Sequence, residues 1–224
     1  MDLKEIKQIF AANANPYDKK SMEAYMRDQF AFYGIRAGKR RDISKTYIKE
    51  AKKSKTIDWN FLEELFRDQK REINYLGLDI LKAQEKLLNL SDFDRLVKLA
   101  TIRPRWDTID VIDTIIGRLG LIENDFDKKI LDLSKNENFW LRRIAIGHQR
   151  KHKEKTKIEL LSQIIKNNLE IPTQTKDETF FINKAIGWAL REYSKTNPAW
   201  VKDFLEENKA DLSALSIREA SKYL

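Results

Sequence analysis

The sequence predicts an all-α fold built as an array of antiparallel helix pairs, and three observations support this. Apolar residues recur at helical spacing through most of the 224 residues. The chain has few helix breakers, with seven glycines and four prolines. A weak internal repeat also groups the helices in pairs. Because 42% of the residues are hydrophobic, the chain is long enough to bury a sizeable core, and we expect one domain, residues 1–224.

Polar capping and turn residues mark where the helices should end. An apolar run of helical period follows each break, often after an Asp or Ser suited to a helix N-cap, so we expect ten to twelve helices and no β-hairpin. The segment 167–178, which contains Pro172, is expected to be a longer connector. The expected breaks are Asn13–Pro16, Ser54–Asp58, Asn89–Asp92, Asn124–Asp127 and Ser134–Asn138.

The repeat is carried by four amphipathic segments, INYLGLDIL, WDTIDVIDTII, WLRRIAIGHQ and FINKAIGWAL, which begin at residues 73, 106, 140 and 181. A further helical pattern precedes each of them, as in two-helix repeat proteins. Such arrays curve, so a basic concave face would suit a rod such as duplex DNA.

Positive charge is concentrated in two segments of a chain whose net charge is +8. Residues 36–55 hold nine Lys/Arg against two acidic residues, and residues 139–157 hold seven against one. Concentrated cations attract polyphosphates through counterion release. They are equally expected on solvated helix faces, so charge alone leaves both interpretations open.

Composition excludes several classes of site and location. The chain has no cysteine, which rules out disulfides, thiolate metal sites and cysteine nucleophiles. No stretch has the apolar length of a signal peptide or of a membrane span. We therefore expect a soluble, cytoplasmic protein without membrane attachment.

The stretch RPRWDTIDVID, residues 103–113, places carboxylates beside a tryptophan. On a helix, Trp106, Asp110 and Asp113 share one sector of about 60°, next to an apolar stripe that contains Ile109 and Ile112. Trp106 and Asp110 should therefore lie side by side at the border of the buried face. The alternative is a boundary tryptophan with solvent-facing acids that support nearby arginines.

Three further segments combine aromatic and basic residues. Trp188 follows a glycine within a helix, and Trp140 comes shortly before the Arg142–Arg143 pair. Residues 22–41 combine Tyr25 and Arg27 with GIRAGKRR, which we expect to be a phosphate-contacting loop. Taken singly, such aromatic residues are more often part of the core.

Several segments, in order from about residue 20 to the C-terminus, resemble the AlkD-like DNA alkylation repair enzymes. They are MEAYMRDQFAFYGI, WDTID, WLRRIAI, FINKAIGWALREYSKTNPAWV and LSALSIREASKYL. The resemblance implies a HEAT-like α-solenoid that grips duplex DNA in a basic concave cleft. It also implies a monofunctional glycosylase that releases cationic N3- and N7-alkylated purines, acting as a monomer without cofactor or metal.

The resemblance also implies roles for individual residues. The catalytic carboxylate falls on Asp110, the paired aromatic residues on Trp106 and Trp188, the cleft arginine on Arg143 and the cleft tyrosine on Tyr25. The other residues expected to contact DNA are Arg27, Arg40, Arg41, Arg142, Arg150, Lys151 and Arg191. Two features depart from the family pattern, Arg105 in place of a tryptophan and the length of segment 167–178.

The chemistry suits these residue types. Cleavage of an N-glycosidic bond builds positive charge on the sugar, which a fixed carboxylate and an electron-rich indole both stabilise. An alkylated purine that is already cationic leaves without a general acid. The alternatives are a non-catalytic HEAT-like module that binds DNA or protein, and an RNA-binding α-solenoid, neither of which needs the carboxylate.

Other motifs are weaker. His148 and His152 are spaced i, i+4, as in zinc sites, but nearby cations would repel a metal, so we expect them to meet phosphate or solvent. No phosphate-binding glycine loop and no Ser–His–Asp arrangement is supported.

Overall fold

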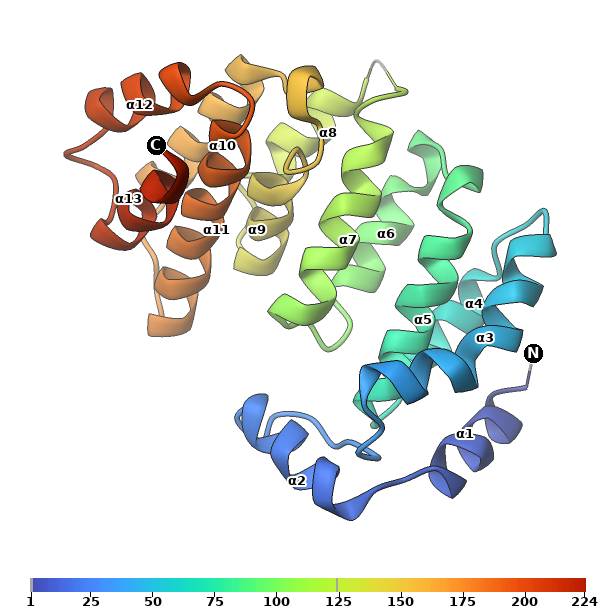
Figure 1. Ribbon diagram of the computed structural model, residues 1–224. Helices are drawn as coiled ribbons and strands as arrows, with labels where there is room; N and C mark the ends of the chain where they lie inside the picture. The colour runs from blue at the N-terminus through green and yellow to red at the C-terminus, as the bar shows by residue number, and fades with distance from the viewer. Residues whose placement is uncertain (1, 124) are drawn as a thin grey trace. The chain divides into compact units, whose positions relative to one another are not determined.

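The computed structural model describes residues 2–123 and 125–224. Figure 1 shows a helical chain. Over the described residues it contains thirteen α-helices and four short 3-10 helices, and the sole β-bridge joins Ala31 and Lys70. The all-helical prediction is therefore confirmed. The helix count exceeds the upper expectation by one, because several helices are only seven to ten residues long. No helix in the described residues is both long and apolar enough to cross a membrane.

The chain folds as two compact units, Met1–Leu88 and Asn89–Leu224, here called the N-terminal and C-terminal units. The expectation of a single domain over residues 1–224 stays a prediction. In the N-terminal unit, α3 and α4 both pack against α5. The helices of this unit are α1 (Leu3–Ala12), α2 (Pro16–Tyr25), α3 (Ala37–Lys53), α4 (Trp59–Arg67), α5 (Arg71–Ala83) and η1 (Glu85–Leu87).

A buried carboxylate organises the loop between α2 and α3. Glu72 is fully buried and accepts hydrogen bonds from the backbone N–H groups of Tyr33, Gly34 and Ile35, at 2.8–3.0 Å. Gly34 has φ +89°, and a Cβ there would lie 2.1 Å from the Asn15 carbonyl oxygen, so this turn requires glycine. The loop is therefore fixed from inside the unit.

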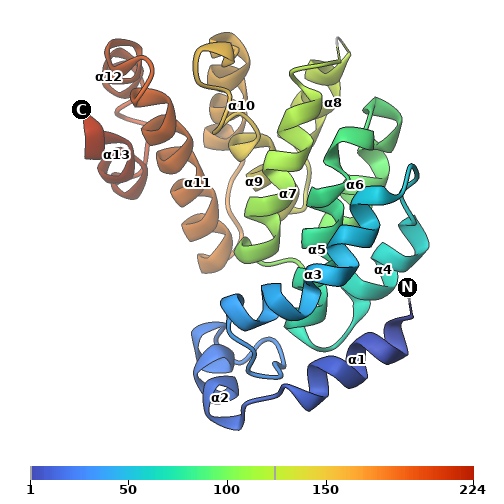
Figure 2. The same ribbon diagram turned by 45° about the vertical axis from the view of Figure 1, so that its right-hand side comes forward.

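The C-terminal unit consists of helix pairs stacked in two layers. Helix α9 packs against both α7 and α11, and α11 packs against α13, so these four helices form one layer; α8 and α10 pack together in the other (Figure 2). The elements of this unit are η2 (Leu90–Asp92), α6 (Phe93–Ala100), α7 (Trp106–Leu119), α8 (Phe126–Leu133), α9 (Phe139–Gly147), η3 (Lys153–Lys155), α10 (Ile158–Glu170), α11 (Lys176–Ser194), α12 (Pro198–Glu207), α13 (Ala214–Ala220) and η4 (Ser221–Tyr223).

The weak repeat in the sequence corresponds to this construction. Its four segments become α5, α7, α9 and α11, and each follows another helix. In α7, the apolar stripe of Ile109, Ile112 and Ile116 is fully buried, as predicted. Burying a side chain of this size contributes about 1.5–3 kcal/mol. Within the C-terminal unit, the repeat therefore reflects one layer of helices, α7, α9 and α11, that bury their apolar faces against their neighbours.

The predicted helix breaks are found at helix N-termini, where polar side chains cap the backbone. Asn15, Asp58 and Asn138 accept hydrogen bonds from backbone N–H groups in the first turns of α2, α4 and α9. Asn89 caps the 3-10 turn before α6 in the same way. At the remaining break Asn124 lies outside the described residues, and α8 begins at Phe126.

Two expected loops are wrong in extent. The connector expected at 167–178 is confined to residues 171–175. At its start, Asn167 and Asn168 belong to α10, where they are buried and donate hydrogen bonds to Ser134. At its end, Thr175 caps α11. The phosphate-contacting loop expected at GIRAGKRR is also shorter than predicted. Its last five residues begin α3, so Arg40 and Arg41 lie on a helix.

The expectation that His148 and His152 face phosphate or solvent is wrong. His148 is 2% exposed and its Nδ1 lies 2.6 Å from the Ala145 carbonyl oxygen, and His152 Nε2 lies 3.0 Å from that of Gly117. Burial lowers the pKa of both, that of His148 to about 3, so both rings are neutral at pH 7. They are core residues at the α7–α9 joint, where a Cβ on Gly117 would lie 1.9 Å from the His148 carbonyl oxygen.

Candidate functional site

Three neighbouring helices of the C-terminal unit bring the main predicted site residues together. Asp110 lies in the second turn of α7, Arg143 in α9 and Trp188 in α11. Asn138 fixes the start of α9 through a 3.0 Å hydrogen bond from the Trp140 N–H. Because α9 packs between α7 and α11, its arginine reaches both neighbours.

Arg143 binds both oxygens of the Asp110 carboxylate. Its Nε donates to Oδ1 and its Nη2 to Oδ2, each at 2.9 Å, while Nη1 donates to the Phe181 carbonyl oxygen at 2.7 Å. The Arg143 side chain is 4% exposed and that of Asp110 is 15% exposed. This fork holds the carboxylate in one orientation and leaves a lone pair on each oxygen for a further partner.

A second ion pair lies one turn further along α7. Arg150 Nη2 donates to Asp113 Oδ2 and, at 3.2 Å, to the backbone carbonyl of Asp110. The Asp113 side chain is 1% exposed. Burial raises the pKa of Asp113 to about 7, with a further contribution from Asp110, although Arg150 opposes the shift. Asp113, which shares the helix sector of Trp106 and Asp110, is therefore fully buried.

The two predicted aromatic partners are both half-buried. Trp188 Nε1 donates to Glu192 Oε1 at 3.3 Å, and the Arg150 guanidinium lies 3.7 Å from the Trp188 ring centre. Trp106 begins α7, one turn before Asp110, so the border position predicted for these two residues is found. Trp140, in contrast, is 7% exposed and packs 4.8 Å from Phe181 as a core residue.

The cluster around Asp110 is closely packed in this structure. The space between its members is too small for a water molecule, so an incoming group meets Asp110 at the surface rather than in a preformed cavity. The residues that enclose this space are Asp110, Asp113, Arg143, Gly147, Arg150, Ala185 and Trp188.

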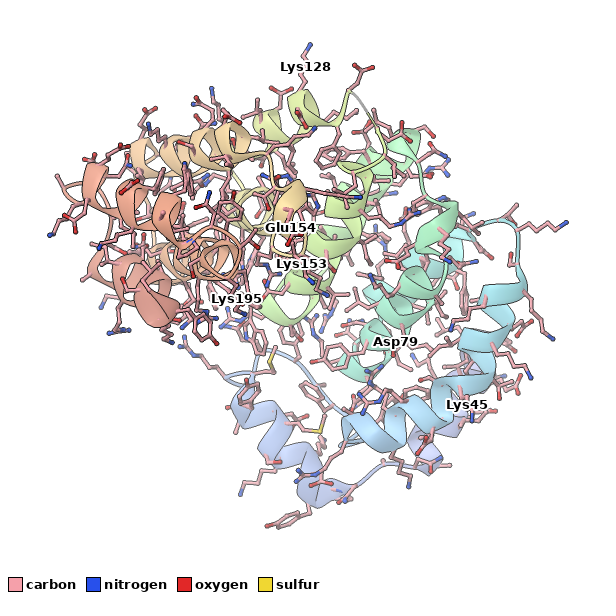
Figure 3. The ribbon with its side chains drawn as sticks, turned by 45° about the horizontal axis from the view of Figure 1, so that its top comes forward. Lys45, Asp79, Lys128, Lys153, Glu154 and Lys195 are labelled. Atoms are coloured by element: carbon pink, nitrogen blue, oxygen red, sulfur yellow. The ribbon has the colours of Figure 1, made fainter. Side chains whose placement is uncertain are left out.

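A hollow of about 490 Å³ lies next to this cluster, with Arg150 in the wall of both. Four cations and two carboxylates line the hollow, so its lining is basic. Figure 3 shows Lys153, Glu154 and Lys195 on the same side of the C-terminal unit. The full lining is Gln149, Arg150, Lys151, Lys153, Glu154, Thr156, Glu192, Tyr193, Lys195 and Thr196.

The residues expected to contact DNA in the C-terminal unit differ in accessibility. Lys151 is exposed, and Arg191 is half-buried and pairs with Glu219 at 2.8 Å. Arg142 is 3% exposed and pairs with Glu178, which is itself buried. This placement does not favour the expected DNA contact of Arg142, because its guanidinium already has a buried partner on α11.

In the N-terminal unit, three of the expected DNA contacts are exposed and one is paired. Tyr25 is 71% exposed, and Arg27 and Arg41 are also exposed. Arg27 has φ +54° in the turn after α2. Arg40 forms an ion pair with Asp79.

Sequence reasoning missed the partners that hold the site together. Asp113, Gly147 and Glu178 were not predicted to take part, and Arg105, expected to be a departure from the family pattern, pairs with Asp177 at 2.9 Å. One signal was present in the sequence, because Asp113 lies one helical turn after Asp110 and shares its sector. Among the described residues no group of His, Asp and Glu is arranged to hold a metal ion.

Comparison with known proteins places the whole of this architecture in one family. Residues 6–224 match the family described as DNA alkylation repair enzyme. The chain is similar to a solved structure titled "Predicted DNA alkylation repair enzyme from Enterococcus faecalis", with 33% identity, a TM-score of 0.84, and coverage of 94% of this chain and 96% of that one. Comparison with curated proteins gives no match. The chain therefore belongs to the DNA alkylation repair enzyme family and has its helical-repeat fold.

Proposed function

We propose that this chain is a monofunctional DNA glycosylase that hydrolyses the N-glycosidic bond of cationic N3- or N7-alkylated purines in duplex DNA. The observation that carries the proposal is the Asp110 carboxylate, held by two 2.9 Å hydrogen bonds from Arg143 and still partly exposed. A carboxylate fixed before the substrate arrives stabilises developing positive charge without the cost of reorganisation.

The proposed reaction uses this carboxylate at the sugar. The bond between C1′ and the purine nitrogen breaks, and its electron pair leaves with the base, which the alkyl group has already made cationic. The base departs neutral, and positive charge remains on C1′ and the ring oxygen of the sugar. Asp110 stabilises that charge, water adds to C1′, and its proton passes to the carboxylate or to solvent.

The half-buried indole of Trp106, and the face of the Trp188 indole opposite Arg150, supply further attraction for the cation. Trp106 lies one turn from Asp110, and Trp188 lies beside it in the enclosing cluster. The π-face of tryptophan attracts a nearby cation by about 0.5–2 kcal/mol, depending on how far water is excluded. Lys151, Lys153 and Lys195, which line the adjacent hollow, suit the phosphates of the DNA strand.

The decisive experiment compares base release by the wild type, Asp110→Asn and Asp132→Asn on duplex DNA that carries N7-methylguanine. Asp132 is exposed on α8, in the other layer, and so controls for the loss of one carboxylate. We expect Asp110→Asn to lower the single-turnover rate about 10²–10³-fold, as when a transition-state-stabilising group is removed. Duplex affinity should stay within about threefold, and Asp132→Asn should behave as the wild type.

The alternatives give different results in the same experiment. A non-catalytic DNA-binding module binds the duplex in a salt-dependent manner and releases no methylated base, and this outcome refutes the proposal. An RNA-binding α-solenoid prefers single-stranded RNA when the two nucleic acids compete. Equal rates for the wild type and Asp110→Asn also contradict the role given to this carboxylate.

A further inference from the structure

Arg150 is enclosed within the C-terminal unit, although its sequence context suggests a phosphate contact. Its side chain is 7% exposed. Nε donates to the Gly147 carbonyl oxygen at 3.2 Å, and Nη2 binds both Asp113 and the backbone carbonyl of Asp110. An arginine used mainly for phosphate binding keeps its guanidinium accessible, whereas this one is committed to partners inside the protein.

The surroundings of this arginine are shaped for the pair that it forms with Asp113. A Cβ on Gly147 would lie 2.3 Å from Asp113 Oδ2 and 3.2 Å from Arg150 Nε. Glycine at this position is therefore required for the carboxylate and the guanidinium to approach each other. Asp113 is itself 1% exposed, so the pair is buried on both sides.

The guanidinium also covers the ring of Trp188. It lies 3.7 Å from the ring centre, and the indole Nε1 is bonded to Glu192 at 3.3 Å. The indole is therefore held at its face and at its edge. Through the Asp110 carbonyl, the same guanidinium contacts the helix turn that presents the proposed catalytic carboxylate.

We propose that Arg150, anchored by Asp113, is a positioning residue that holds the Trp188 indole and the Asp110 turn in their reactive arrangement. This inference rests on the proposed glycosylase function. It assigns Arg150 a role distinct from DNA binding, because its contacts are with the residues that surround the carboxylate. A displacement of about 1 Å of a reacting group lowers a rate by up to about a hundredfold.

The kinetic test uses Arg150→Gln, Arg150→Lys and the control Lys202→Gln on N7-methylguanine duplex DNA. Lys202 is exposed on α12 and is not among the residues that enclose the Asp110 cluster or the hollow, so its variant reports the loss of one positive charge alone. Arg150→Gln should lower kcat about ten- to a hundredfold with KM within about twofold. Arg150→Lys keeps the charge but loses the planar fork, so it should recover only part of kcat.

The opposite pattern overturns the proposal. If Arg150 instead contacts a phosphate, Arg150→Gln should leave kcat unchanged and raise KM. The slope of log affinity for DNA against log salt concentration should then fall by about 1, as for the loss of one phosphate contact. If that variant does not fold, the double variant Asp113→Leu/Arg150→Leu replaces the buried pair with apolar side chains, which is often tolerated. It should show the same loss of kcat, and full activity in it contradicts the proposal.

A second measurement needs no catalysis. The protein is labelled with 5-fluorotryptophan, and the 19F signal of Trp188 is assigned by its absence in Trp188→Phe. This signal should shift and broaden in Arg150→Gln, where the ring loses its cationic cover, and in Asp113→Asn, where that cover loses its carboxylate anchor. An unchanged signal refutes the positioning role even if the wild type is an active glycosylase. A shifted signal in a protein that releases no base supports the positioning role of Arg150 and instead refutes the proposed function.

Discussion

Gly117 lies at the joint between the helix that carries Asp110 and the helix that carries Arg143. A Cβ at this position would lie 1.9 Å from the His148 carbonyl oxygen and 2.9 Å from its carbon. An ordinary contact begins near 3.4 Å, so Gly117→Ala forces the two backbones apart by about 1.5 Å. Neither partner is a flexible side chain, and the strain must therefore change the spacing of α7 and α9.

The expected cost follows from two opposing effects. Overpacking destabilises a core by about 1–3 kcal/mol, while alanine in place of glycine favours a helix by about 1 kcal/mol. We expect Gly117→Ala to lower the free energy of unfolding by up to about 2 kcal/mol. The 2.9 Å bonds between Asp110 and Arg143 join the same two helices, so base release per folded molecule should fall more than tenfold.

Urea denaturation and single-turnover base release, measured on the same preparations, test both effects. The matched control is Gly38→Ala in α3, where a Cβ would meet nothing within 4 Å. This control should raise the free energy of unfolding by up to about 1 kcal/mol and leave base release unchanged. Wild-type stability and full activity in Gly117→Ala would show that the α7–α9 spacing does not control the site.

Two further predictions concern buried carboxylates. The pKa of Asp113 is raised to about 7, so between pH 4 and 7 the folded protein binds a proton that the unfolded chain releases. The free energy of unfolding of the wild type, relative to that of Asp113→Asn, should therefore fall as pH rises through this window, by up to about 1.4 kcal/mol per pH unit. If urea denaturation gives the same difference between the two proteins at every pH, the prediction is wrong. The pKa of Glu219 is lowered to about 2, by hydrogen bonds from Lys184 and Lys222. The stabilisation by the ionised Glu219 is present above pH 4.5 and lost as pH falls through 2. Glu219→Gln should therefore lower the free energy of unfolding by about 2 kcal/mol at pH 7 and by little at pH 2, as measured by thermal unfolding. The exposed control Glu206→Gln should show no such difference between the two pH values.

Local signals in the sequence were sufficient to predict the helices and the layer that carries the site. Asn138 is an example, because a polar residue directly before an apolar run caps the helix that follows. The border position of Asp110 also followed from helical geometry, since its burial depends mainly on the face of α7 that it shares with Trp106. These features depend on residues within about one turn of each other.

The pairing between helices could not be predicted in this way. Arg142 and Arg143 are adjacent and chemically identical, yet one bonds Glu178 on α11 and the other bonds Asp110 on α7. They project about 100° apart, so the rotation of α9 between its neighbours decides which partner each one meets. The same holds for His148, whose polar ring is buried because the end of α9 packs against Gly117.

The site and the joints of the repeat are built from the same interactions. Arg143 joins α9 to Asp110 on α7 and to the Phe181 carbonyl on α11, and Arg150 joins α7 to the indole of Trp188 on α11. Each buried arginine therefore has two effects, because removing it leaves a buried or half-buried carboxylate without its partner and also releases a group near the proposed reacting atoms. Stability and turnover should then fall together in variants of these arginines. In variants of Lys151 and Lys153, the exposed lysines of the adjacent hollow that lie outside these joints, DNA affinity should fall and stability should not.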